Sequence, residues 1–266
     1  VRGEEEAPFS MKVSYTYSEA GRVVEEQIVS MGKTRTLAYG YDHQGHRIFE
    51  SEDDGSLTQE QHFRYDAYDH VLWSYRIVHT DECSITLPNS WMVHVLDPTS
   101  KYSLRASGAG LGPAASDAVA SDLEWEIAIK RLDSDAEAAG AESLSVAGHQ
   151  EMKKFFAHPL VEVDGDVSER ELTLAPGNPA ALLSASFKSW GSEHGHLLVM
   201  VTRDQSDTWI VLWKLIGNLE SLEKVRERYP ALLETYLQSM SFDDRRFDAA
   251  PLIEQLDVLS RESTDR

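Results

Sequence analysis

The chain has 266 residues, enough for one large domain or two ordinary ones, and its 41% hydrophobic and 26% charged residues are normal for a globular protein with a core. Its 45 Asp and Glu outnumber its 25 Lys and Arg, which gives a formal net charge of -20. This charge argues against binding to nucleic acid and favours a basic or apolar partner. No apolar run approaches the roughly 18 residues of a membrane span, so we expect no membrane insertion.

Cys83 is the single cysteine, which excludes an internal disulfide. Its apolar neighbours in Ile85-Thr-Leu87 predict a buried small residue rather than a nucleophile. The N-terminal sequence Val1-Arg-Gly-Glu-Glu-Glu has no signal-peptide pattern. These features are compatible with the cytoplasm, where we expect the protein to act.

Residues 1–12 are expected to form a flexible acidic lead-in, and a pattern that occurs three times follows. Tyr17, Tyr41 and Tyr65 are 24 residues apart, and each is preceded two positions earlier by an aromatic residue. Gly21, Gly45 and Asp69 recur with the same period. Aromatic residues two apart lie on one face of a strand, and Gly or Asp tolerates the positive φ of a tight turn. Each copy therefore predicts a β-hairpin, within a repeat domain spanning 13–80.

Apolar positions after each turn, Val24, Ile48 and Leu72, also recur every 24 residues. This recurrence predicts that the hairpins stack and bury a continuous apolar seam. The alternative is an ordinary small meander of strands.

Over residues 13–78 the pattern resembles the RHS or YD-peptide repeat, whose core reads Tyr-x-Tyr-Asp-x-x-Gly-Arg. Tyr39-x-Tyr41-Asp42-x-x-Gly45 matches well, and the first copy supplies the Arg as Arg22. The resemblance implies a bacterial protein, since members of that family form shells around toxins or extended surface structures. Three copies are too few to enclose a domain.

A different pattern starts at residue 84 and predicts a second domain, 84–243. A short strand ends at Pro88, and Trp91 can pack back on it. Residues 106–122, rich in Ala, Ser and Gly, are expected to be a flexible loop. Strict alternation predicts a strand with Trp125, Ile127 and Ile129 facing the core, followed by a loop over 133–142. Residues 150–156 fit a helical turn or a strand equally well.

Further strands are expected at 169–174 and 181–190, the latter with one apolar face formed by Ala181, Leu183, Ala185 and Phe187. Residues 197–202 and 209–216 are apolar on both faces, which predicts a central hairpin. Asn218 is expected to cap one helix and Pro230 to open another. A last amphipathic segment over 251–259, within a tail spanning 244–266, would dock back or bind another chain.

The order of these elements, with Leu87-Pro88-x-x-Trp91 near the start and Tyr236-x-x-Ser239-x-Ser241-Phe242 at the end, is similar to the PsbP-like fold shared with Eag-type chaperones of type VI secretion. The resemblance implies an α+β, mostly β fold with an antiparallel sheet and C-terminal helices. It also implies a sheet that cradles apolar helical segments of a secreted effector. The long Ala/Ser/Gly loop departs from a compact member of that family.

No pattern in the chain predicts catalysis, so we expect no catalytic residue, no metal ligand and no cofactor. His194-Gly-His196 has a spacing that some metal sites use, but we place it in an exposed turn without a third ligand. Glu124 and Glu126 share the polar face of a strand, as chance predicts in so acidic a chain. Nucleophile elbows, phosphate loops and dinucleotide fingerprints are missing from the sequence.

Four apolar residues are candidates for partner binding: Trp190, Met200, Trp209 and Trp213. Trp209 and Trp213 fall on one face of a strand, and they would line an apolar groove if that side of the sheet were uncovered. The loop 106–122 would then serve as its movable lip. The alternative is packing of these residues in the core.

These observations favour a non-enzymatic chaperone or adaptor for an effector of a bacterial secretion or polymorphic toxin system. One alternative is an immunity protein whose acidic surface covers a basic toxin site. Another is the C-terminal effector tip of an RHS-type toxin. A protein partner is expected in the first two cases, and a homo-oligomer remains open.

Overall fold

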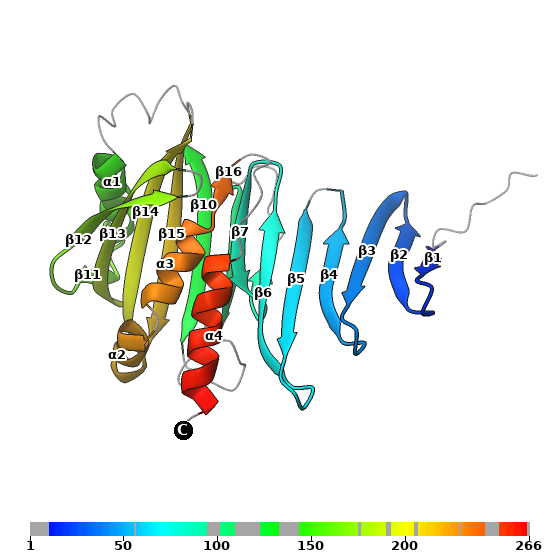
Figure 1. Cartoon of the computed structure of the whole chain (residues 1–266). Helices are drawn as coiled ribbons and strands as arrows, with labels where there is room; N and C mark the ends of the chain where they lie inside the picture. The colour runs from blue at the N-terminus through cyan, green and yellow to red at the C-terminus, as the bar shows by residue number, and fades with distance from the viewer. Residues whose placement is uncertain are drawn as a thin grey trace, which may run out of the picture.

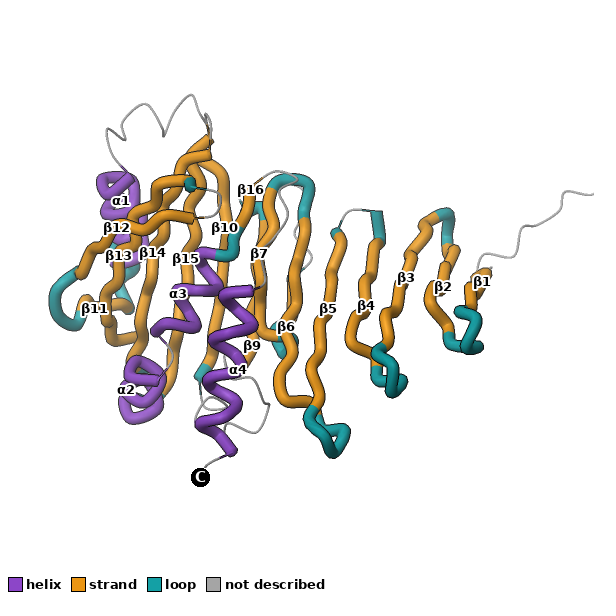
Figure 2. Tube along the Cα trace, in the orientation of Figure 1, coloured by secondary structure: helices purple, strands orange, loops and turns teal. Residues whose placement is uncertain are grey.

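The computed structural model describes residues 11–55, 57–94, 102–109, 123–132, 144–174, 177–189, 193–204, 207–228, 230–242 and 250–264. Within them the fold is α+β and mostly β, as the sequence predicts, with two antiparallel sheets and a few helices (Figure 1). Coloured by element type, the chain shows strands throughout and helices confined to one half of the molecule (Figure 2).

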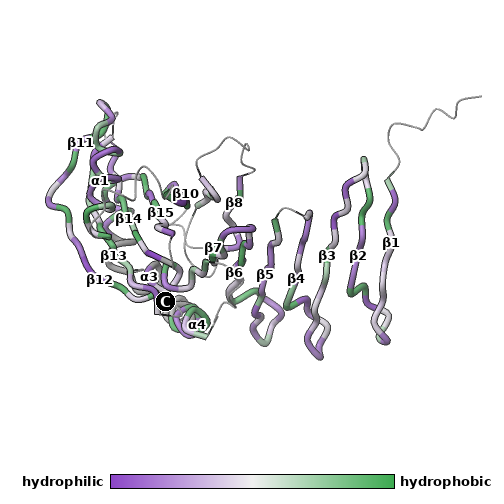
Figure 3. Tube along the Cα trace, turned by 90° about the horizontal axis from the view of Figure 1, so that it is seen from above, coloured by the Kyte–Doolittle hydropathy of each residue, from purple (hydrophilic) through white to green (hydrophobic). Residues whose placement is uncertain are grey.

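The first sheet is a meander in which each strand pairs with the next along the chain. Its strands are β1 (Met11–Tyr17), β2 (Val23–Ser30), β3 (Lys33–Tyr41), β4 (Arg47–Asp53), β5 (Thr58–Tyr65), β6 (Val71–His79) and β7 (Cys83–Pro88), with β16 (Ser241–Phe242) added at the edge. We refer to β1–β6, residues 11–79, as the array. The array projects from the rest of the protein as a single layer, with β1 farthest out (Figures 1 and 3).

The expected boundary between 80 and 84 falls in the β6–β7 hairpin, across which the strands pair from Tyr75–Pro88 to His79–Ser84. The first sheet therefore runs without a break from the array into the predicted second domain. Phe242, near the end of the predicted second domain, pairs with Cys83 in the same sheet. The array is thus anchored to the core by continuous backbone pairing.

The second sheet has the order β11-β13-β14-β15-β10-β9-β8, and β12 also pairs with β13. Its strands are β8 (Met92–Val93), β9 (Leu104–Ala109), β10 (Glu124–Leu132), β11 (Val161–Val163), β12 (Ser168–Leu174), β13 (Asn178–Ser189), β14 (His194–Asp204) and β15 (Asp207–Gly217). The central hairpin β14–β15 confirms the prediction from its two apolar faces. The alternation in β10 is also confirmed, because Trp125, Ile127 and Ile129 are buried.

Both faces of the second sheet are covered. One face packs against β6, β7 and the C-terminal helices around a large core that includes Trp125, Val211 and Trp213. The other packs against helix α1 (Leu144–Phe156), around a smaller core with Leu183, Phe187 and others. A strand that is apolar on both faces needs two such partners.

Helix α1 settles the choice left open for residues 150–156 in favour of a helix. Its Ala147 and Met152 are buried against the sheet. Gly148 allows the close approach, since a Cβ there would lie 2.3 Å from a Leu183 methyl. Glu151 and Lys130 of β10 form a buried ion pair with Nζ and Oε2 2.8 Å apart. Burial of both charges is tolerable because each has the other as partner.

The C-terminal helices are α2 (Leu219–Arg228), α3 (Pro230–Gln238) and α4 (Ala250–Thr264). Asn218 caps α2 as predicted, because its Oδ1 accepts from the backbone N–H of Ser221 at 2.9 Å. Helix α4 docks back on the array: Leu252 and Leu256 are buried, and Asp257 accepts from the Trp73 Nε1–H at 2.7 Å and from Arg64. Of the two outcomes expected for this segment, the structure shows docking.

Two sequence expectations need correction. Residues 106–109 belong to strand β9 rather than to a loop, because Gly108 lies directly beneath Trp91, where a Cβ would be 2.8 Å from its ring. The rest of the predicted loop, 110–122, lies outside the described residues, as does 133–142. His194 and His196 lie in strand β14 rather than in a turn, and Gly195 between them packs against Phe187.

Candidate binding surface: the strand array

The three hairpin turns of the array have the same geometry. The backbone N–H of Gly21, Gly45 and Asp69 each donates to the carbonyl three residues earlier. All three residues have positive φ, at 73°, 102° and 66°. A register shift precedes every turn, at 16/17, 40/41 and 64/65. The predicted hairpins and their 24-residue period are therefore present in the backbone.

The Asp of the motif closes the turn. Oδ1 of Asp42 accepts from the backbone N–H groups of Gln44, Gly45 and His46 at 2.7–2.9 Å. Asp66 accepts in the same way from Tyr68 and His70. A carboxylate that accepts several N–H groups orders a turn without help from a core. This explains how hairpins far from the hydrophobic core keep their shape.

Neighbouring hairpins are joined by a second set of contacts, which also repeats. The Tyr41 hydroxyl donates to the carbonyl of Val23 at 3.0 Å, and the Tyr65 hydroxyl donates to the carbonyl of Arg47 at 3.0 Å. The Arg22 guanidinium lies 5.4 Å from the centroid of the Tyr41 ring. In the next copy, the His46 ring stacks on Tyr65 at 4.9 Å. We call each such set a joint.

His46 lies between two carboxylates. Its Nδ1 is 2.9 Å from Asp42 Oδ2, and its Nε2 is 2.9 Å from Asp69 Oδ1 of the following turn. The hydrogen bond to Asp42 is the main reason that the pKa of His46 is raised. Desolvation tends to raise the pKa of Asp42, but the hydrogen bonds from His46 and Gly45 outweigh this effect and lower that pKa to about 2. His46 therefore links two consecutive turns, and the raised pKa favours its protonated form there.

Strands β1–β5 of the array have almost no core of their own. Leu37 is the one buried residue among the described residues of β1–β5. The predicted continuous apolar seam is therefore wrong: Ile48 is 38% exposed, because the hairpins pair edge to edge in one sheet instead of stacking face to face. Leu72, next to the core, is the seam position that packs against it. Both faces of the outer array are left accessible.

The outermost described strand, β1, carries several exposed large apolar side chains. Within the described residues β1 pairs with β2 alone. Its Met11, Tyr15 and Tyr17 side chains are 68%, 51% and 59% exposed. Such an edge offers a row of backbone N–H and C=O groups beside exposed aromatic rings. Met11, Tyr15 and Tyr17 are therefore candidate contact residues within the described part of the chain.

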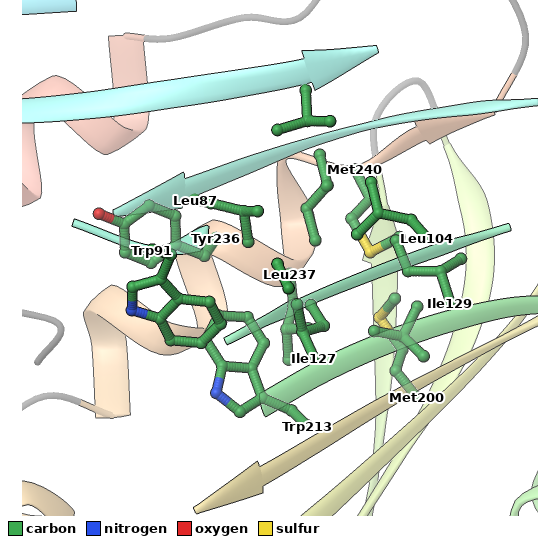
Figure 4. Close-up of a cluster of buried hydrophobic side chains, with 14 of the residues drawn as sticks. Leu87, Trp91, Leu104, Ile127, Ile129, Met200, Trp213, Tyr236, Leu237 and Met240 are labelled. Carbon is green, nitrogen blue, oxygen red and sulfur yellow. The ribbon is translucent and has the colours of Figure 1, made fainter. Parts of the chain in front are cut away.

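The residues predicted to bind a partner lie elsewhere. Met200, Trp209 and Trp213 are all buried in the large core, the last with no exposed surface. Figure 4 shows Met200 and Trp213 among the other core side chains. Trp209 stacks on Phe242 at 4.7 Å, and Trp213 packs against Trp91 at 5.4 Å. The alternative of core packing thus describes these three residues, and partner binding by them stays a prediction that requires the covering elements to move. Trp190 lies outside the described residues.

Groups with possible chemical roles have structural partners. Glu126 pairs with Lys214 at 2.5 Å and with Arg105 on the next strand. Burial raises the pKa of the Cys83 thiol to about 11, which makes it a poor nucleophile, as its sequence context predicts. His196 Nδ1 lies 3.0 Å from Ser186 Oγ. Among the described residues, His, Cys, Asp and Glu form no cluster able to hold a metal ion.

The sequence motif identified Arg22 but not its contact with Tyr41, and it did not identify His46. The two residues occupy the same position in copies 24 residues apart. Comparing equivalent positions for charge, as well as for aromatic and glycine residues, would have found them.

No model of a known protein family matches the chain, and no curated protein matches its sequence. Solved structures that are similar include the cyanobacterial PsbP (CyanoP) of Synechocystis, at 14% identity and a TM-score of 0.42, covering 71% of this chain and 94% of that one. LpqN of Mycobacterium tuberculosis is similar at 12% identity and a TM-score of 0.37, covering 60% and 82%. Both similarities concern the fold and carry no statement about activity or partners.

None of the helices in the described part of the chain combines the length and the hydropathy that crossing a bilayer requires.

Proposed function

We propose that this protein is a non-enzymatic binding protein that acts in the bacterial cytoplasm as a chaperone or adaptor for an effector of a secretion or polymorphic toxin system. The observation that carries the proposal is the array: a single-layer sheet, anchored to the core, that holds exposed aromatic residues on its outermost described strand. Its outer strands β1–β5 contribute little to the hydrophobic core, so their surface is available for a partner.

The association with toxin systems rests on the repeat. The motif Tyr-x-Tyr-Asp-x-x-Gly resembles the RHS or YD-peptide repeat. The turn contacts of Asp42 and Asp66 explain why the motif has Asp at that position. The Asp closes the turn, the Gly takes the positive φ, and the second Tyr reaches the preceding hairpin. These contacts support a repeat of that type.

Co-expression with the product of a neighbouring effector or toxin gene tests the proposal. We expect a complex of fixed stoichiometry and a larger soluble yield of the effector. The control is the same effector expressed without this protein. An effector that folds and is exported equally well without it, and that never co-purifies with it, would refute the chaperone or adaptor role.

A second candidate, an immunity protein, is favoured by the net charge of -20. A strongly acidic protein associates fast with a basic toxin, and this attraction weakens as salt screens the charges. Protection of cells that express the toxin, with an association rate that falls steeply between low and high salt, would favour this candidate over the first. Binding without protection excludes it.

A further inference from the structure

The array contains two joints at equivalent positions, and they differ in the side chain that lies against the tyrosine ring. We call the joint in which Arg22 lies over Tyr41 the outer joint. The joint in which His46 stacks on Tyr65 is the inner joint. In both, the tyrosine hydroxyl donates to a carbonyl of the preceding hairpin at 3.0 Å. Arginine side chains keep their charge at physiological pH, whereas the charge of histidine side chains changes near neutral pH.

The residue that faces this side chain from the next turn differs as well. In the outer joint the position is Gly45, which leaves room for the guanidinium, since a Cβ there would lie 2.5 Å from Arg22 Nη2. Arg22 also reaches the next turn by donating from Nη1 to the carbonyl of Asp42 at 3.4 Å. In the inner joint the position is Asp69, whose Oδ1 is 2.9 Å from His46 Nε2. The shorter histidine is therefore met by a side chain that reaches back to it.

The two carboxylates make the inner joint depend on the proton of His46. Asp42 Oδ2 lies 2.9 Å from Nδ1, and Asp69 Oδ1 lies 2.9 Å from Nε2. An ionised carboxylate only accepts hydrogen bonds, and a neutral imidazole has a single N–H. The protonated ring can therefore donate to both turns, but the neutral ring can donate to one. Loss of the proton leaves a ring nitrogen and a carboxylate oxygen facing each other as two acceptors.

The surrounding charges agree with this geometry. The other charged or titratable side chains of the three turns and of the residue after His46 are Glu19, Arg22, His43, Arg47, Asp66 and His70. Arg47 pairs with Glu50 at 3.0 Å, and Asp66 pairs with His70 at 3.3 Å. The hydrogen bond to Asp42 is the main cause of the raised pKa of His46, and the charges of Asp42 and Asp69 add to it against desolvation. A pKa raised on folding stabilises the fold fully below the ordinary value of 6.5, and this stabilisation is lost as the pH rises through the raised value.

We propose that the inner joint is a pH-sensitive switch in the array. Protonated His46 ties the β3–β4 turn to the β5–β6 turn, and neutral His46 loosens the end of the β4–β5 pairing beside it. The outer joint, with Arg22, stays closed over the same pH range. The pH therefore changes how rigidly β1–β4 are held on β5 and β6, which continue into the core through β7. The switch goes beyond the proposed function, because it belongs to the array itself and acts without a partner.

An NMR titration of the histidine rings in the full chain tests the contact between the turns. We expect His46 to titrate above the ordinary value of 6.5 and its pKa to fall in the Asp69→Asn variant, which removes the charge. Asn tolerates the positive φ of 66° at this position, so the turn is kept. Asp53→Asn is the matched control, because Asp53 is exposed at the other end of β4, and it should leave the pKa of His46 unchanged.

Amide hydrogen exchange from about pH 5 to about pH 9, with each rate divided by its intrinsic rate at that pH, tests the switch itself. Protection of the amides over 62–65 should fall about threefold as His46 loses its proton, as expected for exposed ion pairs. His46→Arg supplies a permanent charge, as Arg22 does in the outer joint, and should abolish this fall. His46→Gln should show the lower protection at every pH. Protection over 39–41, beside the outer joint, should stay constant in all three proteins.

Three results would overturn the switch. The first is a pKa of His46 that is the same in the wild type and in Asp69→Asn. The second is protection over 62–65 that depends on pH equally in the wild type and in His46→Arg, and the third is an equal loss of protection at the two joints. If His46→Gln unfolds the outer hairpins, the comparison of the wild type with His46→Arg still decides, because that variant keeps a charge at the joint.

Discussion

Trp213→Ala distinguishes a core tryptophan from one that lines a groove for a partner. The side chain has no exposed surface and packs among the rings of Trp91, Trp125 and Tyr236 at 5.4–6.4 Å. Truncation removes roughly 150 Å² of buried apolar area, worth about 4 kcal/mol at about 25 cal/mol per Å². This agrees with the ~3–5 kcal/mol usually lost on truncating a buried Trp.

Thermal unfolding followed by circular dichroism measures the effect, and we expect the melting temperature to fall by about 8–16 °C. Trp213→Phe is the matched control: it keeps most of the packing and removes an indole N–H that has no acceptor among the described atoms. That variant should lose only about 1–2 kcal/mol. If Trp213→Ala melts within about 2 °C of the wild type, the ring is not in the core and the packing described here is wrong.

Three further predictions concern the array and its anchor. Gly45→Ala should destabilise the array by about 1–2 kcal/mol or more, because φ is +102° and the new Cβ would lie 2.5 Å from Arg22 Nη2. Gly21→Ala should cost less, because its φ is +73° and the space around it is open. Amide exchange of the two hairpins measures the difference. Asp257→Ala should release α4 at a cost of about 1.5–3 kcal/mol, because Trp73 and Arg64 lose a charged acceptor. We expect faster hydrogen exchange of the α4 amides. Unchanged exchange would show that the apolar contacts of α4 suffice to hold it. The pKa of Asp42 falls from its ordinary 3.8 to about 2 on folding, so its contribution to stability should be complete above about pH 5 and be lost as the pH falls through about 2. An NMR titration giving an ordinary pKa would contradict the turn geometry.

The hairpins were predictable because their determinants are local. A positive φ at Gly21 and Gly45 and a carboxylate at Asp42 act within one turn, so the 24-residue spacing carries the structure directly. The distinct central strands were predictable for a similar reason, since an alternating or continuous apolar pattern specifies which faces are buried.

What covers each face was not predictable from the same patterns. The strand β15 is apolar on both sides, and this pattern does not say whether a helix or a partner lies against it. Helix α1 was ambiguous because its contact with the sheet depends on Gly148, which has no apolar side chain to signal burial. The continuation of the first sheet from β7 to β16 depends on long-range pairing of Phe242 with Cys83, and the short segments involved gave no sign of it.

Hydrogen exchange of the full chain, free and bound to an effector recovered by co-expression, tests most directly whether the array is the binding surface. The account predicts protection on binding that is greatest in β1 and extends into the β1–β2 hairpin, with β14 and β15 unchanged because they are already buried. Protection confined to β14, β15 and the elements around Trp213, with β1 exchanging as in the free protein, would contradict it.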